Sequence, residues 1–126
     1  MGFEPGGLLI DLLQTGVRVG IGGWSDDQSA LMAALPEDLR AQLLEAGATA
    51  DICSTVLDAD GREVTIGDLP GRSIAITASQ LRAVPDVVAI VGGGQQRAAA
   101  IRAALRSGII HRLITDVETA QALLAP

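Results

Sequence analysis

The most constraining feature of the sequence is a strand, a glycine cluster and a helix that follow one another over residues 87–106. Val87–Val91 are five consecutive apolar residues, which is typical of a buried strand. Gly92–Gly94 end this run, and a helical period begins beyond them. Its apolar face contains Ala98, Ile101 and Leu105. A helix N-terminus directs free N–H groups and a positive dipole end toward the turn, and glycine permits a close approach to the backbone, so the segment is a candidate anion site.

The glycine cluster lacks the spacing of the familiar nucleotide-binding motifs. Counting from Gly92, the dinucleotide pattern G-x-G-x-x-G needs glycine at position 97, where the sequence has Arg97. The chain also has no lysine, which a P-loop or a Schiff base would require. Two interpretations stay open: the glycines only let the helix pack closely on the strand, or the helix start binds an anion. Arg97 favours the anion, because the dipole disfavours a cation in the first helical turn unless bound negative charge offsets it.

The core of the chain must be built almost entirely from aliphatic side chains. Hydrophobic residues make up 48% of the 126 residues, yet there is one Trp, one Phe and no Tyr. This composition suits strands and Ala- and Leu-rich helices that pack in layers within a single α/β domain. The net charge of −6 argues against a basic groove for nucleic acid on this chain.

In the first half of the chain, short strands alternate with short helices. We expect strands at Val17–Ile21 and Asp51–Leu57, and helices at Leu8–Gln14, after Ser25 or Asp26, and after Pro36. Asp58–Gly61 predicts a turn, and residues 62–66 then return as a short antiparallel strand, so that a hairpin forms at the edge of the domain. The apolar stripe of the helix after Pro36 includes Leu44.

In the second half, strands and helices alternate with tight connections. Ser79 is a candidate cap for a short helix over residues 80–83, and Ile109–Ile114 predicts a further strand. Thr115 and Glu118 have the spacing of a capping box for the last helix, whose inward side includes Leu124. Strand, helix and strand then form a parallel βαβ unit with a right-handed crossover. Ligands bind at the carboxyl edge of such sheets, where the glycine cluster lies.

Three polar features allow more than one interpretation. Asp51 opens a strand, where its carboxylate suits sugar hydroxyls, but a solvated turn residue fits equally well. Gly22 and Gly23 form a second junction between a strand and glycines, which either faces a ligand or is simply a tight turn. His111 has no histidine partner and lies within a strand, so we expect an exposed or edge-facing structural residue.

The remaining residues point to no catalytic or metal site. Cys53 is the only cysteine and is expected in the core, so that no internal disulfide or cysteine-based metal site forms. No stretch of the sequence is long and apolar enough for a membrane span, and no basic signal-peptide start is present, so the cytoplasm is the expected compartment.

Five short motifs follow one another along the chain in a recognisable order. They are Gly20–Gly22, Ala50–Ile52, Leu57–Arg62, Ile90–Ala98 and Leu113–Asp116. In this order the sequence resembles the C-terminal half of the sugar-binding domain of SorC-family bacterial transcriptional regulators, over roughly residues 9–125. The resemblance implies an open parallel sheet with βαβ units and a small β-hairpin, in a three-layer fold like that of phosphosugar isomerases and CoA transferases. Residues 1–126 are then a single, partial effector domain.

The resemblance also implies ligand-binding residues. They are Gly22, Gly23, Asp51, Gly93, Gly94 and Arg97. Arg97 stands where the family usually has a lysine that binds an effector phosphate, and Asp51 matches an acidic residue that contacts sugar hydroxyls. Two departures leave the identity of the effector open: Ala50 replaces a glycine, and arginine differs from lysine in reach and geometry.

The implied function is that of a non-enzymatic effector module, which binds a sugar phosphate for a DNA-binding transcriptional regulator. No cofactor is implied, and a homo-oligomer, either dimer or tetramer, is expected. The family's helix-turn-helix domain and the first half of its effector domain have no counterpart in residues 1–126, so DNA contact is expected only through a separate segment. Two alternatives remain: an enzyme similar to sugar-phosphate isomerases, with Asp51 as general base, and a truncated fragment that only dimerises.

Overall fold

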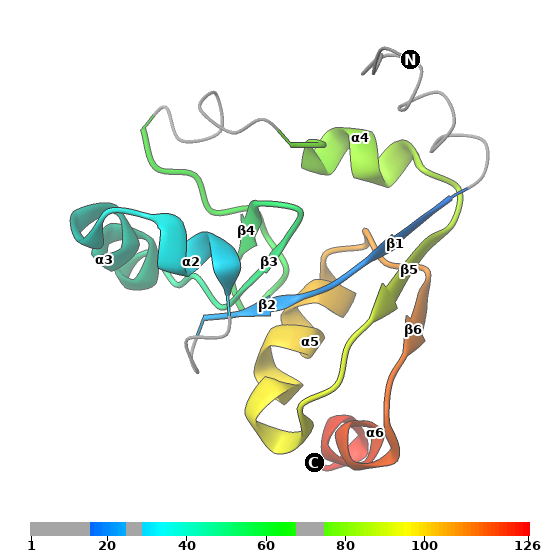
Figure 1. Ribbon diagram of the computed structural model, residues 1–126. Helices are drawn as coiled ribbons and strands as arrows, with labels where there is room; N and C mark the ends of the chain where they lie inside the picture. The colour runs from blue at the N-terminus through cyan, green and yellow to red at the C-terminus, as the bar shows by residue number, and fades with distance from the viewer. Residues whose placement is uncertain (1–15, 25–28, 68–74) are drawn as a thin grey trace.

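The computed structural model describes residues 16–24, 29–67 and 75–126. Figure 1 draws the other segments as a grey trace. The helix expected at Leu8–Gln14 lies outside the described residues, as do Ser25 and Asp26. Neither caps the next helix, Ala30–Ala34, as expected, because that helix begins later and Ser29 is its N-cap.

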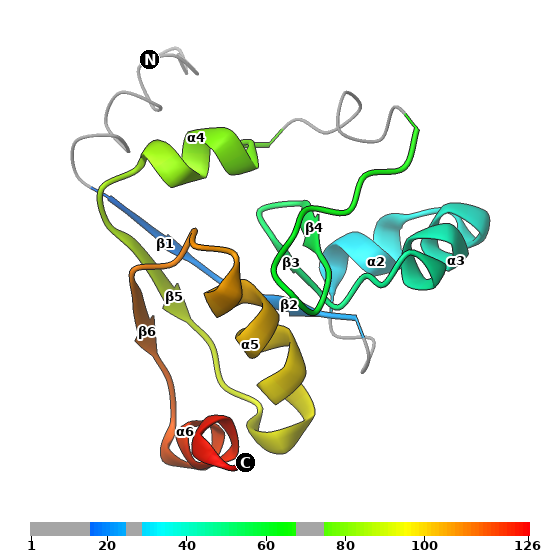
Figure 2. The ribbon, with the colours of Figure 1, turned by 180° about the vertical axis from the view of Figure 1, so that it is seen from behind.

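A parallel sheet forms one half of the molecule. It contains β1 (Val17–Val19), β5 (Val87–Ile90) and β6 (Arg112–Ile114) in the order β1-β5-β6, with both pairs parallel. Helix α5 (Ala98–Arg106) connects β5 to β6 and lies against one face of the sheet (Figures 1 and 2). The predicted α/β class and the parallel βαβ unit are confirmed.

Helix α5 carries small side chains on the face that it buries in the core. Ala100, Ile101, Ala103 and Ala104 are at most 1% exposed and share one apolar cluster with Val87 and Ala89 of the sheet. Alanine at these positions lets the helix axis approach the strands without leaving voids.

A small antiparallel sheet forms the second half. It contains β2 (Gly22–Gly23), β3 (Ala50–Ile52) and β4 (Thr55–Leu57) in sequence order. The single strand expected at Asp51–Leu57 is therefore wrong, because the chain reverses at Cys53 and Ser54, whose φ angles are +49° and +69°. Positive φ at both central residues is the geometry of a two-residue hairpin turn, usually supplied by Asn-Gly.

The second predicted turn is present but its return strand is not. Gly61 has φ +82°, and the Asp58 carboxylate accepts hydrogen bonds from the backbone N–H groups of Asp60 and Arg62, each at 2.9 Å. Beyond this turn, only one isolated bridge joins Leu57 to Glu63. The expected antiparallel return is therefore confirmed only at this bridge, where the N–H of Val64 donates to the carbonyl oxygen of Val56 at 2.8 Å, and no strand extends over residues 62–66.

Five further helical segments complete the described structure. They are α2 (Ala30–Ala34), α3 (Glu37–Glu45), α4 (Ala78–Ala83), the 3₁₀ turn η2 (Gly94–Arg97) and α6 (Val117–Leu124). Two cap predictions are wrong by one or two residues. Thr77 rather than Ser79 caps α4, in a reciprocal box with Gln80, and Asp116 rather than Thr115 caps α6. Leu44 and Leu124, expected to face inward, are 42% and 85% exposed.

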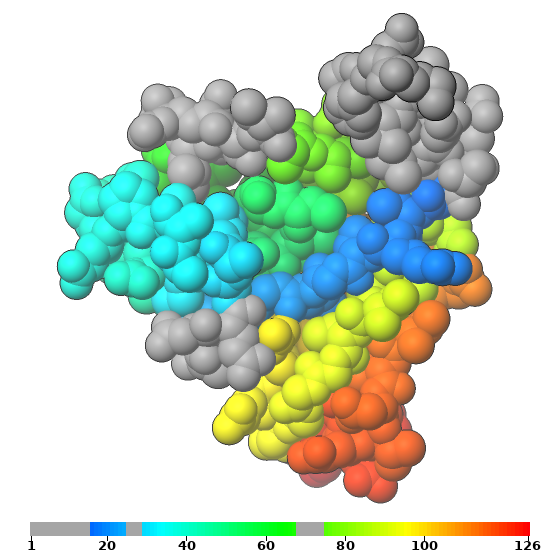
Figure 3. Space-filling view, in the orientation of Figure 1, coloured from blue at the N-terminus to red at the C-terminus, as the bar shows by residue number. Residues whose placement is uncertain are grey.

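The other face of the parallel sheet is not covered by a helix of the described part of the chain. Ile90 and Ile114, neighbours in the register of β5 and β6, are 50% and 55% exposed. In the space-filling view β1, β5 and β6 lie side by side on the surface (Figure 3). We call this surface the open sheet face.

Candidate functional site

The Asp51 carboxylate is the most enclosed acidic group among the described residues. Its residue is 9% exposed, in the centre strand of the small sheet. The indole Nε1–H of Trp24 donates to Oδ2 at 2.8 Å, and the Ser29 hydroxyl donates to the same oxygen. Asp51 is therefore not a solvated turn residue; that alternative is wrong, because β3 continues through it and two side chains cover it.

Gly22 lies directly against this carboxylate. It is the strand partner of Asp51, so Gly22 and Gly23 are paired β residues rather than a tight turn. A Cβ atom on Gly22 would lie 2.5 Å from Asp51 Oδ2 and 2.8 Å from Oδ1. Real Cβ atoms do not approach other atoms so closely, and glycine at position 22 thus makes room for the acidic group.

Arg97 approaches the same strand from the other half of the molecule. It is half-buried at the junction of η2 and α5, and its Nη1–H donates to the carbonyl oxygen of Ile21 at 2.5 Å. Ile21 directly precedes Gly22, which supports Asp51. The predicted cation and the predicted carboxylate therefore contact two consecutive residues, and the fold brings together the positions that sequence reasoning singled out.

The glycine loop at the start of η2 is occupied by α6. The N–H of Gly94 donates to Thr119 Oγ1 at 2.8 Å. A Cβ on Gly92 would lie 2.4 Å from Asp116 Oδ2. The glycines therefore let the first turn of α6 approach the loop closely. Close packing was expected from the helix that follows the glycines, but the helix that packs on them is α6. The Gly94 amide, expected to hold an anion, already has an acceptor in this structure.

Arg97 also depends on the glycine loop for its position. Gly93 has φ +118°, and a Cβ there would lie 2.4 Å from Arg97 Cγ. The stem of the arginine therefore runs over the glycine, which explains why its guanidinium can reach back to Ile21. Gly93 supports the predicted cation by leaving space as well as by its backbone geometry.

Hydrogen bonds at the start of α6 lower the pKa of Asp116. The main cause is the backbone N–H of Thr119, followed by the Thr119 side chain. Burial raises the pKa, and the nearby backbone N–H of Gly93 lowers it by a smaller amount. The Thr119 N–H lies 2.7 Å from Oδ1. A carboxylate at a helix N-cap is stabilised in its charged form by such donors. The capped Asp116 carboxylate thus lies directly against Gly92 of the glycine loop.

Two further polar side chains lie at the ends of β6. His111 Nδ1 accepts a hydrogen bond of 3.0 Å from the backbone N–H of Val87, and the residue is exposed as expected. It directly precedes β6, so the expected strand over Ile109–Ile114 with His111 inside it is wrong. Thr115 Oγ1 is buried with no hydrogen-bond partner in the part of the chain that the structure describes. Within the same residues, no group of three His, Cys, Asp or Glu side chains could hold a metal ion.

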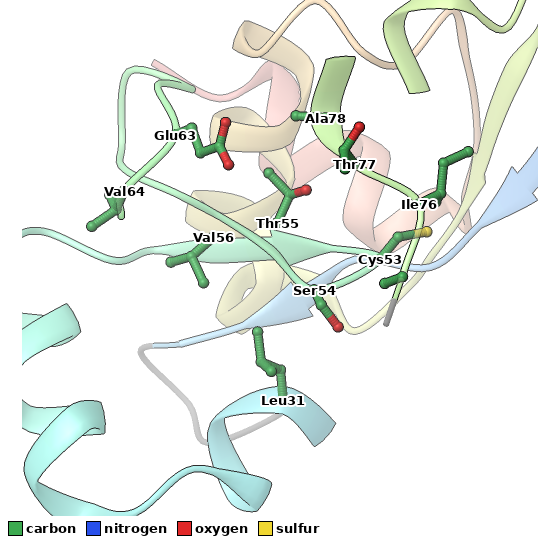
Figure 4. A pocket seen from close by; sticks show the side chains of 11 residues that line it. Leu31, Cys53, Ser54, Thr55, Val56, Glu63, Val64, Ile76, Thr77 and Ala78 are labelled. Atoms are coloured by element: carbon green, nitrogen blue, oxygen red, sulfur yellow. The ribbon is translucent and has the colours of Figure 1, made fainter. Parts of the chain in front are cut away.

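A separate small cavity lies between α2, the β3–β4 hairpin and the start of α4 (Figure 4). Its volume is about 80 Å³, and its lining includes Cys53, Thr55, Glu63 and Thr77. None of the predicted ligand-binding residues lines it. The space suits a few water molecules rather than a sugar phosphate, because small-molecule sites usually occupy about 300 Å³ or more.

Cys53 at the edge of this cavity is half-buried in the hairpin turn rather than within the core. Burial and, secondly, the Asp51 carboxylate raise the pKa of its thiol. The side chain still packs against the main apolar cluster. The expected core location is therefore wrong, since the turn that places Cys53 at the edge was not predicted.

Sequence reasoning missed Trp24, Ser29 and Thr119 as partners of the site. A signal existed for Trp24, because a buried indole usually finds an acceptor for its N–H and this is the only tryptophan. Ser29 and Thr119 carry no comparable signal, since their contacts depend on how α2 and α6 dock.

Comparison with known proteins shows the family to which the chain belongs. Residues 15–125 match the family model described as "Putative sugar-binding domain". The chain belongs to this sugar-binding domain family. The LsrR transcriptional regulator of Klebsiella pneumoniae is 40% identical over 79 residues, which are 63% of this chain and 24% of that regulator. LsrR of Escherichia coli K12 is 40% identical over 78 residues. The matched segment thus spans about a quarter of these relatives.

Solved structures place the sugar-binding domain in the same fold. A transcriptional regulator from Streptococcus pneumoniae superposes with a TM-score of 0.76 at 27% identity, over 93% of this chain and 50% of that one. The full-length sorbitol operon regulator SorC from Klebsiella pneumoniae gives 0.74 at 28% identity, over 86% and 35%. The family resemblance and the fold class are therefore confirmed. No helix of the described residues is long and apolar enough to cross a bilayer.

Proposed function

We propose that this domain binds a sugar phosphate as the effector of a transcriptional regulator. Arg97 would contact the phosphate, Asp51 would accept a sugar hydroxyl, and the Gly22–Gly23 strand would lie between them. The observation that carries the proposal is the approach of Arg97 and Asp51 to the consecutive residues Ile21 and Gly22. Sugar phosphates combine an anion with hydroxyl donors, and this pair offers a partner for each.

The regulator context supports binding rather than turnover. The matched relatives are named as transcriptional regulators, and the family is a sugar-binding one. An isomerase would need a general base near its substrate carbon, and Asp51 Oδ2 already accepts two hydrogen bonds. We therefore assign Asp51 a binding role. DNA contact would come from a separate segment of the regulator, and effector binding would alter its affinity for DNA through the relative geometry of the parts.

Calorimetric titration of the chain tests the assignment. The probes are the monophosphates of ribose, glucose and fructose, together with inorganic phosphate. We expect at least one sugar phosphate to bind saturably and Arg97→Ala to weaken it about tenfold or more, because a charge-assisted contact to the phosphate is lost.

Arg106→Ala is the matched control. Arg106 is on the same helix and also donates to a backbone carbonyl, that of Ala59 at 3.0 Å. Its removal deletes a cation and one carbonyl contact without touching the proposed site. Equal weakening by both variants would show that only net charge matters, and failure of every sugar phosphate to bind the unmodified chain would refute the proposed function.

A further inference from the structure

Both hydrogen bonds that the described residues make to the Asp51 side chain fall on one oxygen. Trp24 Nε1–H and the Ser29 hydroxyl donate to Oδ2, and Oδ1 has no donor among these residues. A carboxylate has about four acceptor positions, so two donors on one oxygen leave the other able to accept. The asymmetry is notable in a group that is only 9% exposed.

The surroundings prevent the carboxylate from rotating. Gly22 packs against both oxygens, at distances that exclude even a methyl group. Trp24 is 2% exposed and belongs to the apolar cluster with Met32 and Leu43, so its indole is fixed. A carboxylate held between a rigid donor and a backbone surface presents Oδ1 in one direction.

Ser29 connects this arrangement to α2. Its Oγ accepts a hydrogen bond of 3.0 Å from the backbone N–H of Met32 while its O–H donates to Asp51. The N-cap of α2 and the orientation of the carboxylate therefore depend on the same hydroxyl. Side chains that orient another group in this way commonly set the geometry of a binding site.

We propose that Trp24 and Ser29 are positioning residues that hold Asp51 Oδ1 toward a hydroxyl group of the effector. The inference rests on the proposed function and adds to it a basis for specificity. Arg97 would contact any phosphate, whereas the positioned Oδ1 would accept from a hydroxyl group that lies away from the phosphate, which a sugar phosphate has and inorganic phosphate lacks. The site thereby favours a hydroxylated phosphate ester over inorganic phosphate, because a buried acceptor left unpaired penalises the ligand that lacks the donor.

The test compares the unmodified chain with Ser29→Ala, Ser29→Thr and Trp24→Phe, titrated with the same sugar monophosphates and with inorganic phosphate. We expect Ser29→Ala and Trp24→Phe each to weaken the bound sugar phosphate about tenfold, the loss of one hydrogen bond to a charged group. The affinity for inorganic phosphate should stay within about twofold, since this ion has no hydroxyl beyond the group that Arg97 would hold. Ser29→Thr should retain the affinity of the unmodified chain, because threonine keeps the hydroxyl.

Thr77→Ala is the matched control for loss of a cap. Thr77 caps the short helix α4 by accepting from Gln80 N–H at 3.1 Å, much as Ser29 caps α2, and it makes no contact with Asp51. This variant should lose stability without a change in sugar phosphate affinity.

A spectroscopic readout monitors the hydrogen bond directly. Trp24 is the only tryptophan, so the chain has one indole N–H resonance. Ser29→Ala and Asp51→Asn should both move that resonance in the ligand-free protein, and Thr77→Ala should leave it in place. This resonance reports the Trp24–Asp51 hydrogen bond in proteins that keep Trp24. The inference therefore stays testable if the core variant Trp24→Phe does not fold.

The outcomes separate the two claims. If the unmodified chain binds a sugar phosphate and Ser29→Ala changes neither its affinity nor the preference over inorganic phosphate, the positioning role is overturned and the proposed function stands. If Ser29→Ala and Thr77→Ala weaken the sugar phosphate equally, the effect is structural and the positioning role is again overturned. If no sugar phosphate binds the unmodified chain, the proposed function fails and the inference with it.

Discussion

At the scale of single residues, the site depends on a glycine that leaves space for a carboxylate. Gly22→Ala should destabilise the chain by about 1–3 kcal/mol, because the new Cβ meets an Asp51 side chain that Trp24 and Ser29 hold in place. Gly20→Ala is the control, since a Cβ there has no atom within 4 Å, and its effect should stay within about 0.5 kcal/mol. Urea unfolding measures both. Equal stability of the two variants would contradict the close packing of Gly22 on Asp51.

Ser54 has a left-handed backbone conformation, which serine adopts less readily than glycine. With φ +69° in an exposed turn, it should gain about 0.5–1 kcal/mol of stability from Ser54→Gly. The same substitution at Ser79, exposed in α4, should cost about 0.5 kcal/mol, because the backbone there is helical. Thermal or urea unfolding of both variants gives the comparison. A loss of stability in Ser54→Gly would show that the turn is not in the left-handed conformation.

At the scale of elements, the glycine loop and α6 hold each other in place. The pKa of Asp116 is lowered in the folded chain, chiefly by the Thr119 N–H. Its charged form therefore stabilises the fold above the unfolded pKa of about 3.9, and this contribution is lost as the pH falls through the lower folded pKa.

The comparison that isolates this effect is with Asp116→Asn. Asparagine also caps helices but has no charge, so the unmodified chain should be more stable near neutral pH and the difference should shrink as the pH falls below the unfolded pKa. Asp86, whose pKa is lowered by Arg112, titrates identically in both proteins and cancels. Unfolding free energies measured across this range check the prediction. A difference that does not change with pH would mean that the charge on Asp116 contributes nothing.

The elements that the sequence predicts correctly are those with a local signal. Val87–Val91, the glycine cluster and the parallel βαβ unit follow from an apolar run, a glycine break and helical periodicity. The β3–β4 hairpin escaped prediction because Cys53 and Ser54 are not residues that normally adopt positive φ. The contacts of Asp51 escaped because Trp24 and Ser29 are 27 and 22 residues away, and only the folded chain brings them together.

At the scale of the whole molecule, the open sheet face exposes two neighbouring isoleucines. Ile90 and Ile114 are paired in the register of β5 and β6 and are 50% and 55% exposed. Exposed apolar side chains that lie together often mark an interaction surface, and we propose that two copies of the chain associate through this face. Sedimentation should show concentration-dependent association that Ile114→Glu abolishes. Leu124→Glu, at an exposed position at the end of α6, is the control and should leave association unchanged. Association that survives Ile114→Glu would place the contact elsewhere.

The central claim is that the two halves of the molecule form one effector site across Ile21 and Gly22. A crystal structure of the chain with a bound sugar phosphate tests it most directly. We expect the phosphate within hydrogen-bond distance of the Arg97 guanidinium and a sugar hydroxyl on Asp51 Oδ1, with Trp24 and Ser29 still donating to Oδ2. A ligand located instead in the cavity beside Cys53 and Glu63, or on the open sheet face, would contradict it.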